Sequence, residues 1–309
     1  MRFSLTGLVA AVHTPLRADG SLHLDRVGRI VEHHVGQELG GIMVCGSTGE
    51  GPLLTTHERR AVAEAYVNAA RGKLKVIVHV GHSSVAEARG LASHAQELGA
   101  DGVVALSPWY AKPSSAEVLA ACCAEIAAGA PELPFYYYHI PSMTGVHLPM
   151  TDLLRRAGDL IPNFVGVKYT SPTIPEFQSC VAFDGGRFDV LYGTDEMLLA
   201  GLAAGARGAI GSTYNFAAPL YRRLWSAFNR GDLEEARACQ QRSVDFLDIL
   251  YRHRNQPAIK AVMKLIGIDC GPSRLPLVTL TSKELSDLER DLSAIGFFEW
   301  ALEAPARLS

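Results

Sequence analysis

Residues 135–169, FYYYHIPSMTGVHLPMTDLLRRAGDLIPNFVGVKY, decide the fold because they contain one complete strand–helix–strand unit. The runs 135–140 and 164–169 are rich in aromatic and β-branched residues, which favour strands. Between them, residues 151–157 repeat apolar side chains at the 3.6-residue spacing of a helix. A helix between two strands is the usual connection in a parallel sheet, so this unit predicts an α/β fold.

The same alternation continues along most of the chain, and the expected strands begin roughly 20 to 35 residues apart. Strands are expected at residues 8–12, 42–45, 76–80, 102–106, 135–140, 164–169, 190–192 and 209–210. Helices are expected at residues 25–38, 56–70, 86–98, 116–127, 151–157, 174–181, 196–204 and 219–228. Thr55 followed by Glu58 forms a capping box that marks the start of the second helix. Eight alternating pairs predict a (β/α)8 TIM barrel, with a doubly wound open sheet as the alternative.

The pattern changes to helices alone after residue 232, with helical periodicity at 233–254, 258–266 and 282–294. No linker of low complexity separates these helices from the preceding units. We therefore expect one structural domain, in which a barrel over residues 1–230 carries a helical extension over residues 231–309.

Composition excludes several classes of protein. The 309 residues include 29 Lys and Arg against 32 Asp and Glu, so the basic excess that nucleic acid binding requires is absent. No apolar run reaches the roughly 18 residues of a membrane helix. The six cysteines form no C-x-x-C pair, which is typical of reduced thiols and predicts a cytoplasmic protein.

Lys168 is the strongest candidate for chemistry, because catalytic groups of such barrels lie at the carboxyl ends of strands. Strand alternation places Phe164, Gly166 and Lys168 on one face. A lysine inside a barrel either pairs with a carboxylate or serves a function, since an unpaired buried charge is costly. Burial favours the neutral amine, which a Schiff-base nucleophile requires. The sequence therefore leaves two roles for Lys168, a structural ion pair and a Schiff-base nucleophile. Gly166 is expected to leave space for a small ketone beside the amine.

Two further strand ends carry candidate residues. Tyr138 shares a face with Tyr136 while Tyr137 points the other way, so Tyr138 either packs in the core or carries protons. The turn 46–49 offers backbone N–H groups and two hydroxyls that suit a carboxylate. Glu50 is expected to accept hydrogen bonds from backbone amides. The histidines lack the spacing of a metal motif, so no metal site is expected.

Five motifs in the order of the chain resemble the class I pyruvate-dependent lyases related to dihydrodipicolinate synthase, over roughly residues 5 to 300. The motifs are Gly46-Ser47-Thr48-Gly49-Glu50, Tyr138-His139-Ile140-Pro141, Gly166-Val167-Lys168, Gly193-Thr194-Asp195-Glu196 and Gly211-Ser212-Thr213-Tyr214-Asn215. The resemblance implies a homotetramer of barrels, each with three C-terminal helices. It implies no cofactor other than the covalent imine between Lys168 and pyruvate.

The resemblance also assigns roles to individual residues. Lys168 would form a Schiff base with the C2 carbonyl of pyruvate, and Tyr138 would relay protons to and from the substrate hydroxyl. Ser47 and Thr48 would hold the pyruvate carboxylate. Tyr110 resembles a tyrosine that family members contribute near a neighbouring active site. The sugar-binding part would be lined by Thr170, Gly193, Asp195, Glu196 and Ser212.

Two departures from the family pattern bear on the substrate. His139 stands where many bacterial members carry asparagine, and Met143 stands where dihydrodipicolinate synthase would place an arginine. The loss of that arginine favours an uncharged sugar aldehyde, so we expect reversible cleavage of N-acetylneuraminate (a sialic acid) to pyruvate and N-acetylmannosamine. Another pyruvate-dependent lyase, a 2-keto-3-deoxy-sugar-acid aldolase or a dihydrodipicolinate synthase-like enzyme, is the alternative. A catalytically silent barrel that senses small molecules is a third, which the presence of Lys168 and Tyr138 disfavours.

Overall fold

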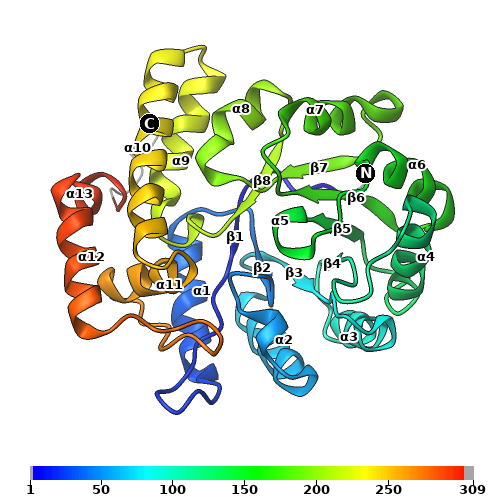
Figure 1. Cartoon of the computed structure of the whole chain (residues 1–309), viewed down its shortest axis with the longest axis horizontal. Coiled ribbons are helices and arrows are strands. Elements are labelled where there is room, and N and C mark those ends of the chain that lie inside the picture. The colour runs from blue at the N-terminus through cyan, green and yellow to red at the C-terminus, as the bar shows by residue number, and fades with distance from the viewer. Residues whose placement is uncertain (1–2, 303–309) are drawn as a thin grey trace.

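In the computed structural model, which describes residues 3–302, eight parallel strands close into a barrel (Figure 1). The strands are β1 Gly7–Ala11, β2 Gly41–Val44, β3 Lys75–His79, β4 Gly102–Leu106, β5 Phe135–His139, β6 Phe164–Tyr169, β7 Asp189–Tyr192 and β8 Gly208–Gly211. Each strand pairs with the next in sequence, and β1 pairs with β8 to complete the ring. The predicted TIM barrel is confirmed, and the open-sheet alternative is wrong.

Helices surround the barrel between successive strands (Figure 1). They are α1 Val27–Gly36, α2 Thr56–Ala70, α3 Val85–Glu97, α4 Ala116–Ala127, α5 Pro141–Thr144, α6 Met150–Leu160, α7 Ile174–Ala182, α8 Leu198–Ala203 and α9 Tyr214–Asn229. Short 3₁₀ helices are η1 Leu24–Arg26, η2 Gly51–Leu53, η3 Phe183–Gly186 and η4 Asp195–Met197. The predicted capping box is present at α2, where Thr55 Oγ1 accepts from Glu58 N at 3.2 Å and Glu58 Oε2 accepts from Thr55 N at 2.9 Å.

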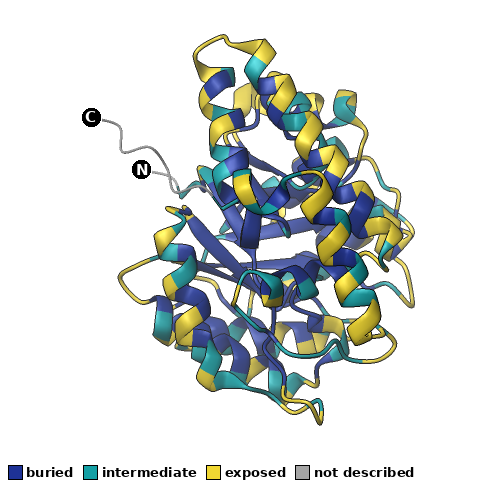
Figure 2. Cartoon of the chain, turned by 90° about the vertical axis from the view of Figure 1, so that its left-hand side faces the viewer, coloured by how far each residue is buried: buried dark blue, intermediate teal, exposed yellow. Residues whose placement is uncertain are grey.

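The apolar residues form two layers on either side of the strands. Met43, Ile77 and Val104 belong to the layer inside the barrel, whereas Val44 and Val78 belong to the layer between strands and helices. Figure 2 shows the result, with buried strands at the centre and exposed residues on the outer faces of the helices. Because side chains fill the barrel, space for a ligand is left only beyond the strand ends.

The expected alternation in β6 is wrong at its first residues. Phe164 does not share the inner face with Lys168 but packs outward, with its ring centroid 6.4 Å from that of Phe135, and Val165 belongs to the inner layer. The reason is a shift of register, since Phe135 pairs with Phe164 while the next residue, Tyr136, pairs with Gly166. The shift lies upstream of Lys168, which pairs with Tyr138 and keeps the expected inward direction.

Gly166 has a different role from the expected one. A Cβ atom built on Gly166 would lie 1.8 Å from the backbone oxygen of Asp189 on β7. The space beside Gly166 is therefore filled by the neighbouring strand, and the expectation that it accommodates a ketone is wrong. Glycine is needed here because only a residue without a side chain permits this close approach.

The C-terminal helices lie along one side of the barrel, next to α9 and α1 (Figure 1). They are α10 Leu233–Arg252, α11 Gln256–Leu265, α12 Ser282–Ala294 and the short α13 Phe297–Trp300. The boundary expected between residues 230 and 231 falls in the turn between α9 and α10, and residues 1–2 and 303–309 lie outside the described residues. No helix within residues 3–302 is long and apolar enough to cross a membrane.

Two histidines are enclosed between the barrel and its helices. His13 follows β1 and His34 lies on α1, and both side chains are buried. None of their four ring nitrogens makes a hydrogen bond with residues that the structure describes. Burial lowers the pKa of each imidazole to about 3, so both histidines are neutral in the folded protein.

We expect these histidines to make the fold sensitive to acid. Their pKa is about 6.5 in the unfolded chain, so between pH 6.5 and 3 the unfolded state binds more protons, and stability falls as pH decreases through this window. At pH 5.5 each histidine should remove about 1.4 kcal/mol from the free energy of unfolding at neutral pH. Urea unfolding at pH 7.5 and 5.5 measures this loss. His34→Leu should reduce the loss by about 1.4 kcal/mol, the contribution of this one histidine. An unchanged difference between the two pH values would contradict the assignment.

Candidate active site

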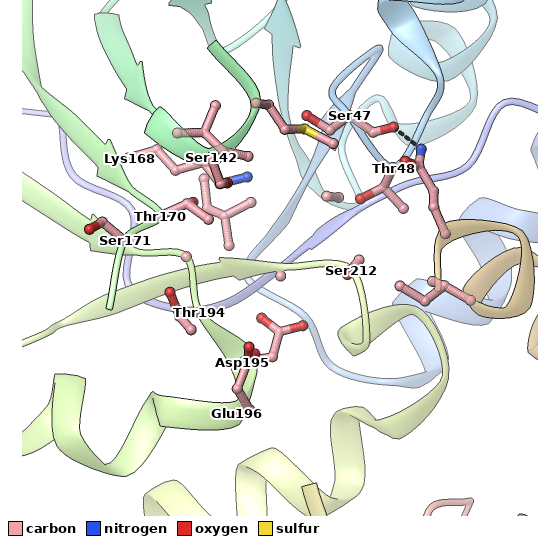
Figure 3. Close-up of a pocket in the computed structure, with 18 of the residues that line it drawn as sticks. Ser47, Thr48, Ser142, Lys168, Thr170, Ser171, Thr194, Asp195, Glu196 and Ser212 are labelled. Atoms are coloured by element: carbon pink, nitrogen blue, oxygen red, sulfur yellow. Dashed lines mark hydrogen bonds between the residues drawn. The ribbon is translucent and has the colours of Figure 1, made fainter. Parts of the chain in front are cut away.

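A cavity of about 350 Å³ lies at the carboxyl ends of the strands. It is open to a ligand between the turns that follow β2, β5, β6, β7 and β8 and the helices α10 and α11 (Figure 3). The structure brings together in its wall every site residue expected from the sequence except Tyr110: Ser47, Thr48, Tyr138, Lys168, Thr170, Gly193, Asp195, Glu196 and Ser212.

Lys168 reaches the cavity from the end of β6 and is only 3% exposed. Its Nζ atom lies 4.0 Å from the ring centroid of Tyr138. Within the described part of the chain it makes no hydrogen bond and no ion pair. The structure therefore provides no carboxylate partner for the structural ion pair that the sequence left open.

Lys260 on α11 shows what a structural buried lysine looks like in this chain. It is also 3% exposed, but its Nζ atom donates to Glu50 Oε1 at 2.7 Å and to the Pro272 carbonyl at 2.7 Å. The other oxygen of Glu50 accepts from the backbone N–H of Arg274 at 2.7 Å, which is the role expected for this carboxylate. Of the two buried lysines, one is fully paired and the other faces the cavity.

Tyr138 lies beside Lys168 because the two residues are partners across β5 and β6. Its ring belongs to the inner layer, and the ring of His79 packs edge-on against it at 6.0 Å between centroids. Tyr137 belongs instead to the outer layer, as the strand alternation predicts. Because Tyr138 lines the cavity beside Lys168, its hydroxyl can transfer protons to and from a bound carbonyl compound.

The turn after β2 presents Ser47 and Thr48 to the cavity, opposite Asp195 and Glu196 in the view of Figure 3. The chain enters and leaves this turn through Cys45 and Glu50, which have positive φ angles of 60° and 56°. The backbone N–H groups of Ser47 and Thr48 donate to none of the described residues. Two free N–H groups and two hydroxyls together suit a carboxylate.

Asp195 and Glu196 lie in η4, directly after β7. Asp195 is buried, and its Oδ2 atom accepts from the backbone N and the Oγ1 of Thr213 at 2.9 and 2.6 Å. Burial raises the pKa of Asp195 to about 6, although the bonds from Thr213 and the charge of Lys168 act in the opposite direction. Glu196 Oε1 accepts from the hydroxyl of Tyr251 at 3.0 Å.

Small residues shape the wall beside these acids. A Cβ atom on Gly211 would lie 1.9 Å from Asp195 Oδ1, so only glycine leaves room for the carboxylate. The hydroxyl of Thr170 is buried without a hydrogen bond to any described residue. Ser212 adds a further hydroxyl-bearing side chain to the wall. The wall thus combines acceptors with hydroxyls that can also donate, as binding of a polyhydroxylated ligand requires.

Three residues named in the sequence analysis lie outside the cavity or only at its mouth. Tyr110 is 92% exposed and does not line the cavity. His139 points outward, where its ring stacks at 5.0 Å on that of Tyr169, and burial lowers its pKa to about 4. Met143 lines the mouth of the cavity and is more than half exposed.

The C-terminal helices form a part of the wall that the sequence did not predict. Leu247 and Tyr251 on α10 and Gln256 on α11 line the cavity, and Gln256 Nε2 donates to the Ser47 carbonyl. The spacing of Leu247 and Tyr251 indicates one helix face, but it does not say which end of the barrel that face meets. Within residues 3–302, no group of three or more His, Cys, Asp or Glu side chains could hold a metal ion.

A closed α/β barrel with an unpaired lysine and a tyrosine in the cavity at its strand ends has the layout of a barrel enzyme. The chain belongs to the dihydrodipicolinate synthetase family, whose sequence profile matches residues 4–295, and it is a carbon–carbon lyase. It is 41% identical over 298 residues to an N-acetylneuraminate lyase of Mus musculus, covering 95% of this chain and 93% of the relative.

Solved structures agree with this assignment. An N-acetylneuraminate lyase of Proteus mirabilis superposes with a TM-score of 0.93 at 40% identity, covering 96% of this chain and 100% of the other. A sialic acid aldolase of Aliivibrio salmonicida gives a TM-score of 0.93 at 38% identity, with coverages of 96% and 98%.

Proposed function

We propose that the protein is a Schiff-base lyase that reversibly cleaves N-acetylneuraminate to pyruvate and N-acetylmannosamine. The observation that carries the proposal is the contrast between Lys168, which has no partner in the cavity, and Lys260, which is paired with Glu50. The relatives at about 40% identity that are named N-acetylneuraminate lyases support the choice of substrate. Incubation with N-acetylneuraminate and detection of both products is the direct test.

The reaction begins with formation of the imine. Ser47 and Thr48 hold the carboxylate of the open-chain substrate, so that its C2 carbonyl faces Lys168. The neutral amine attacks C2, and the carbonyl oxygen leaves as water after taking a proton from Tyr138. The product is a protonated imine on Lys168 and a phenolate on Tyr138.

Cleavage uses both groups. The protonated imine accepts the electron pair of the C3–C4 bond, while Tyr138 accepts the proton of the C4 hydroxyl as the aldehyde forms. The resulting enamine takes at C3 the proton that Tyr138 has just accepted, which restores the protonated imine and the phenolate. Water then hydrolyses the imine to release pyruvate and neutral Lys168, and the proton set free returns to Tyr138. No metal or organic cofactor is required, because the imine itself serves as the electron sink.

The sugar end of the substrate is assigned to Thr170, Gly193, Asp195, Glu196 and Ser212. A second substrate carboxylate would need a cationic partner, typically arginine, and Met143 offers none. Among the described residues, Lys168 is the only Lys or Arg that lines the cavity. Asp195 and Glu196 would also repel an acidic aldehyde, so the site favours a neutral polyol.

We expect N-acetylneuraminate to have the highest kcat/KM in a side-by-side comparison with a 2-keto-3-deoxy-sugar acid. Condensation of pyruvate with aspartate semialdehyde should be negligible. Glu196→Ala should cost on the order of 1–3 kcal/mol in kcat/KM through one lost hydrogen bond. Glu196→Gln retains an acceptor and should lose less. If the sugar acid is preferred by tenfold or more, the 2-keto-3-deoxy-sugar-acid aldolase replaces the proposed activity.

We further propose a cytoplasmic homotetramer. Tyr110 and Leu275 are large apolar side chains that are 92% and 77% exposed in the single chain, as expected for residues covered by another subunit. In such an assembly Tyr110 would lie near the active site of a neighbour.

A further inference from the structure

A ring of four polar contacts lies behind the cavity wall at Asp195. Its Oδ2 atom is 2.6 Å from Thr213 Oγ1, which is 2.8 Å from the hydroxyl of Tyr221. That hydroxyl is 2.7 Å from Ser243 Oγ, and Ser243 Oγ is 3.4 Å from the Asp195 carbonyl. Thr213 follows β8, Tyr221 lies on α9 and Ser243 lies on α10, so the ring joins the C-terminal extension to the barrel.

The direction of these bonds follows from the number of protons. An ionised carboxylate only accepts, and each hydroxyl has one proton to donate. Thr213 therefore donates to Asp195, Tyr221 donates to Thr213, and Ser243 donates to Tyr221. The proton of Ser243 is then used, so its 3.4 Å contact with the Asp195 carbonyl is not a hydrogen bond in this state. Thr213, Tyr221 and Ser243 are fully buried, so their three hydroxyls are shielded from water. In this chain each hydrogen bond polarises the next toward the charge on Asp195.

The same ring also accommodates the protonated acid. If Asp195 Oδ2 carries a proton, it donates to Thr213, and the next two bonds reverse their direction. Ser243 then donates to the Asp195 carbonyl, which its 3.4 Å separation allows. A second contact fixes this carbonyl in both states, because Gln240 Nε2 on α10 donates to it at 3.2 Å.

We propose that Tyr221 and Ser243 are positioning residues that determine sugar selectivity by holding the Asp195 carboxylate through Thr213. This inference rests on the proposed function. Asp195 Oδ1 is buried and has no hydrogen bond of normal geometry among the described residues, although the side chain of Tyr214 also interacts with this carboxyl group. We assign Oδ1 to a substrate hydroxyl. The ring fixes the rotation of the carboxylate and thereby the direction from which that hydroxyl must approach.

The ring also bears on the charge of Asp195. Burial raises the pKa of Asp195 to about 6, and the two bonds from Thr213 oppose that rise because they favour the ionised form. Loss of these donors should therefore raise the pKa further. The other titratable groups that act on Asp195 or respond to it are Lys168 from β6, Glu196 from η4, Tyr214 and Tyr221 from α9, and Tyr251 from α10.

The test compares Thr213→Val, Thr213→Ser and Tyr221→Phe with the control Tyr66→Phe. Tyr66 is a buried tyrosine of α2 whose hydroxyl donates to the His13 carbonyl at 2.6 Å, outside the ring. Thr213→Val and Tyr221→Phe should raise KM for N-acetylneuraminate about 5- to 10-fold with kcat changed less. In both variants the acid limb of the kcat/KM profile should also lie at higher pH than in the wild-type protein. Thr213→Ser retains the hydroxyl, so its KM and pH profile should stay near those of the wild type. Tyr66→Phe should also leave KM and the pH profile unchanged.

Two results separate the ring from the proposed function. If the wild-type protein cleaves N-acetylneuraminate but Tyr221→Phe and Thr213→Val match Tyr66→Phe in KM and pH profile, the positioning role is overturned. If the wild type does not cleave the substrate, the proposed function fails. The ring is then judged by ¹³C NMR titration of the Asp195 carboxyl, whose pKa must rise in Tyr221→Phe and Thr213→Val and not in Tyr66→Phe.

Discussion

Lys168→Met should abolish covalent capture of pyruvate and lower kcat by roughly 10⁴-fold or more, the scale seen when a covalent nucleophile is removed. Methionine fills nearly the same volume but has no amine to attack the carbonyl. The wild-type protein treated with pyruvate and borohydride should carry one stable adduct, because reduction fixes the imine. Mass spectrometry of its peptides should place that adduct on Lys168.

Lys260→Met provides the matched control, since Lys260 is the other buried lysine. Removing it leaves Glu50 buried without its ammonium partner, which should cost about 3–5 kcal/mol of folding free energy. The adduct on Lys168 should still form in the folded fraction. A wild-type adduct on Lys260 or Lys264, or no adduct at all, would overturn the Schiff-base mechanism.

The barrel could be predicted from sequence because its signals are local. β4 and β6 occupy the predicted ranges, and α2 begins where the side chains of Thr55 and Glu58 satisfy the first amides of the helix. The rule that strand ends carry the chemistry then selected the turns that now line one cavity. Each of these inferences depends on residues that are close together in the chain.

What the sequence does not reveal depends on distant contacts. The helix expected to begin at Pro219 is preceded by one further turn that begins at Tyr214, and the two parts of α9 meet at a kink at Ala217, whose φ and ψ of −124° and 22° are not helical. Proline has no N–H to donate to the carbonyl four residues earlier. That carbonyl belongs to Asn215 and accepts from His33 Nε2 on α1 at 2.8 Å, so it is not left unpaired where α9 kinks.

The site shows the same limit. The register shift in β6 turns Phe164 outward against Phe135 and Phe188, which strand alternation cannot reveal. Tyr251 reaches Glu196 across 55 positions of sequence. Long-range contacts of this kind complete a site whose reactive centre was recognisable from local patterns.

Tyr138→Phe should lower kcat by roughly 10²- to 10⁴-fold, the usual contribution of a positioned acid–base group. The ring beneath Lys168 is retained, so the amine keeps its packing and only the proton carrier is lost. Borohydride should still trap pyruvate on Lys168, but more slowly, because the departing C2 oxygen loses its proton donor. This separates Tyr138→Phe from Lys168→Met, in which no adduct forms.

Tyr137→Phe tests the assignment by removing the neighbouring hydroxyl from the opposite face of β5. That hydroxyl is buried in the outer layer, where the Ser107 hydroxyl is its polar neighbour, and it does not line the cavity, so its loss should cost at most one weak hydrogen bond away from the site. Turnover should therefore stay near the wild-type value, with little change in stability. Steady-state kinetics with N-acetylneuraminate, together with stopped-flow measurement of imine formation, compares the two variants. Equal losses in both variants would contradict the assignment of the inward and outward faces of β5, and the proton relay would have to be assigned to another group.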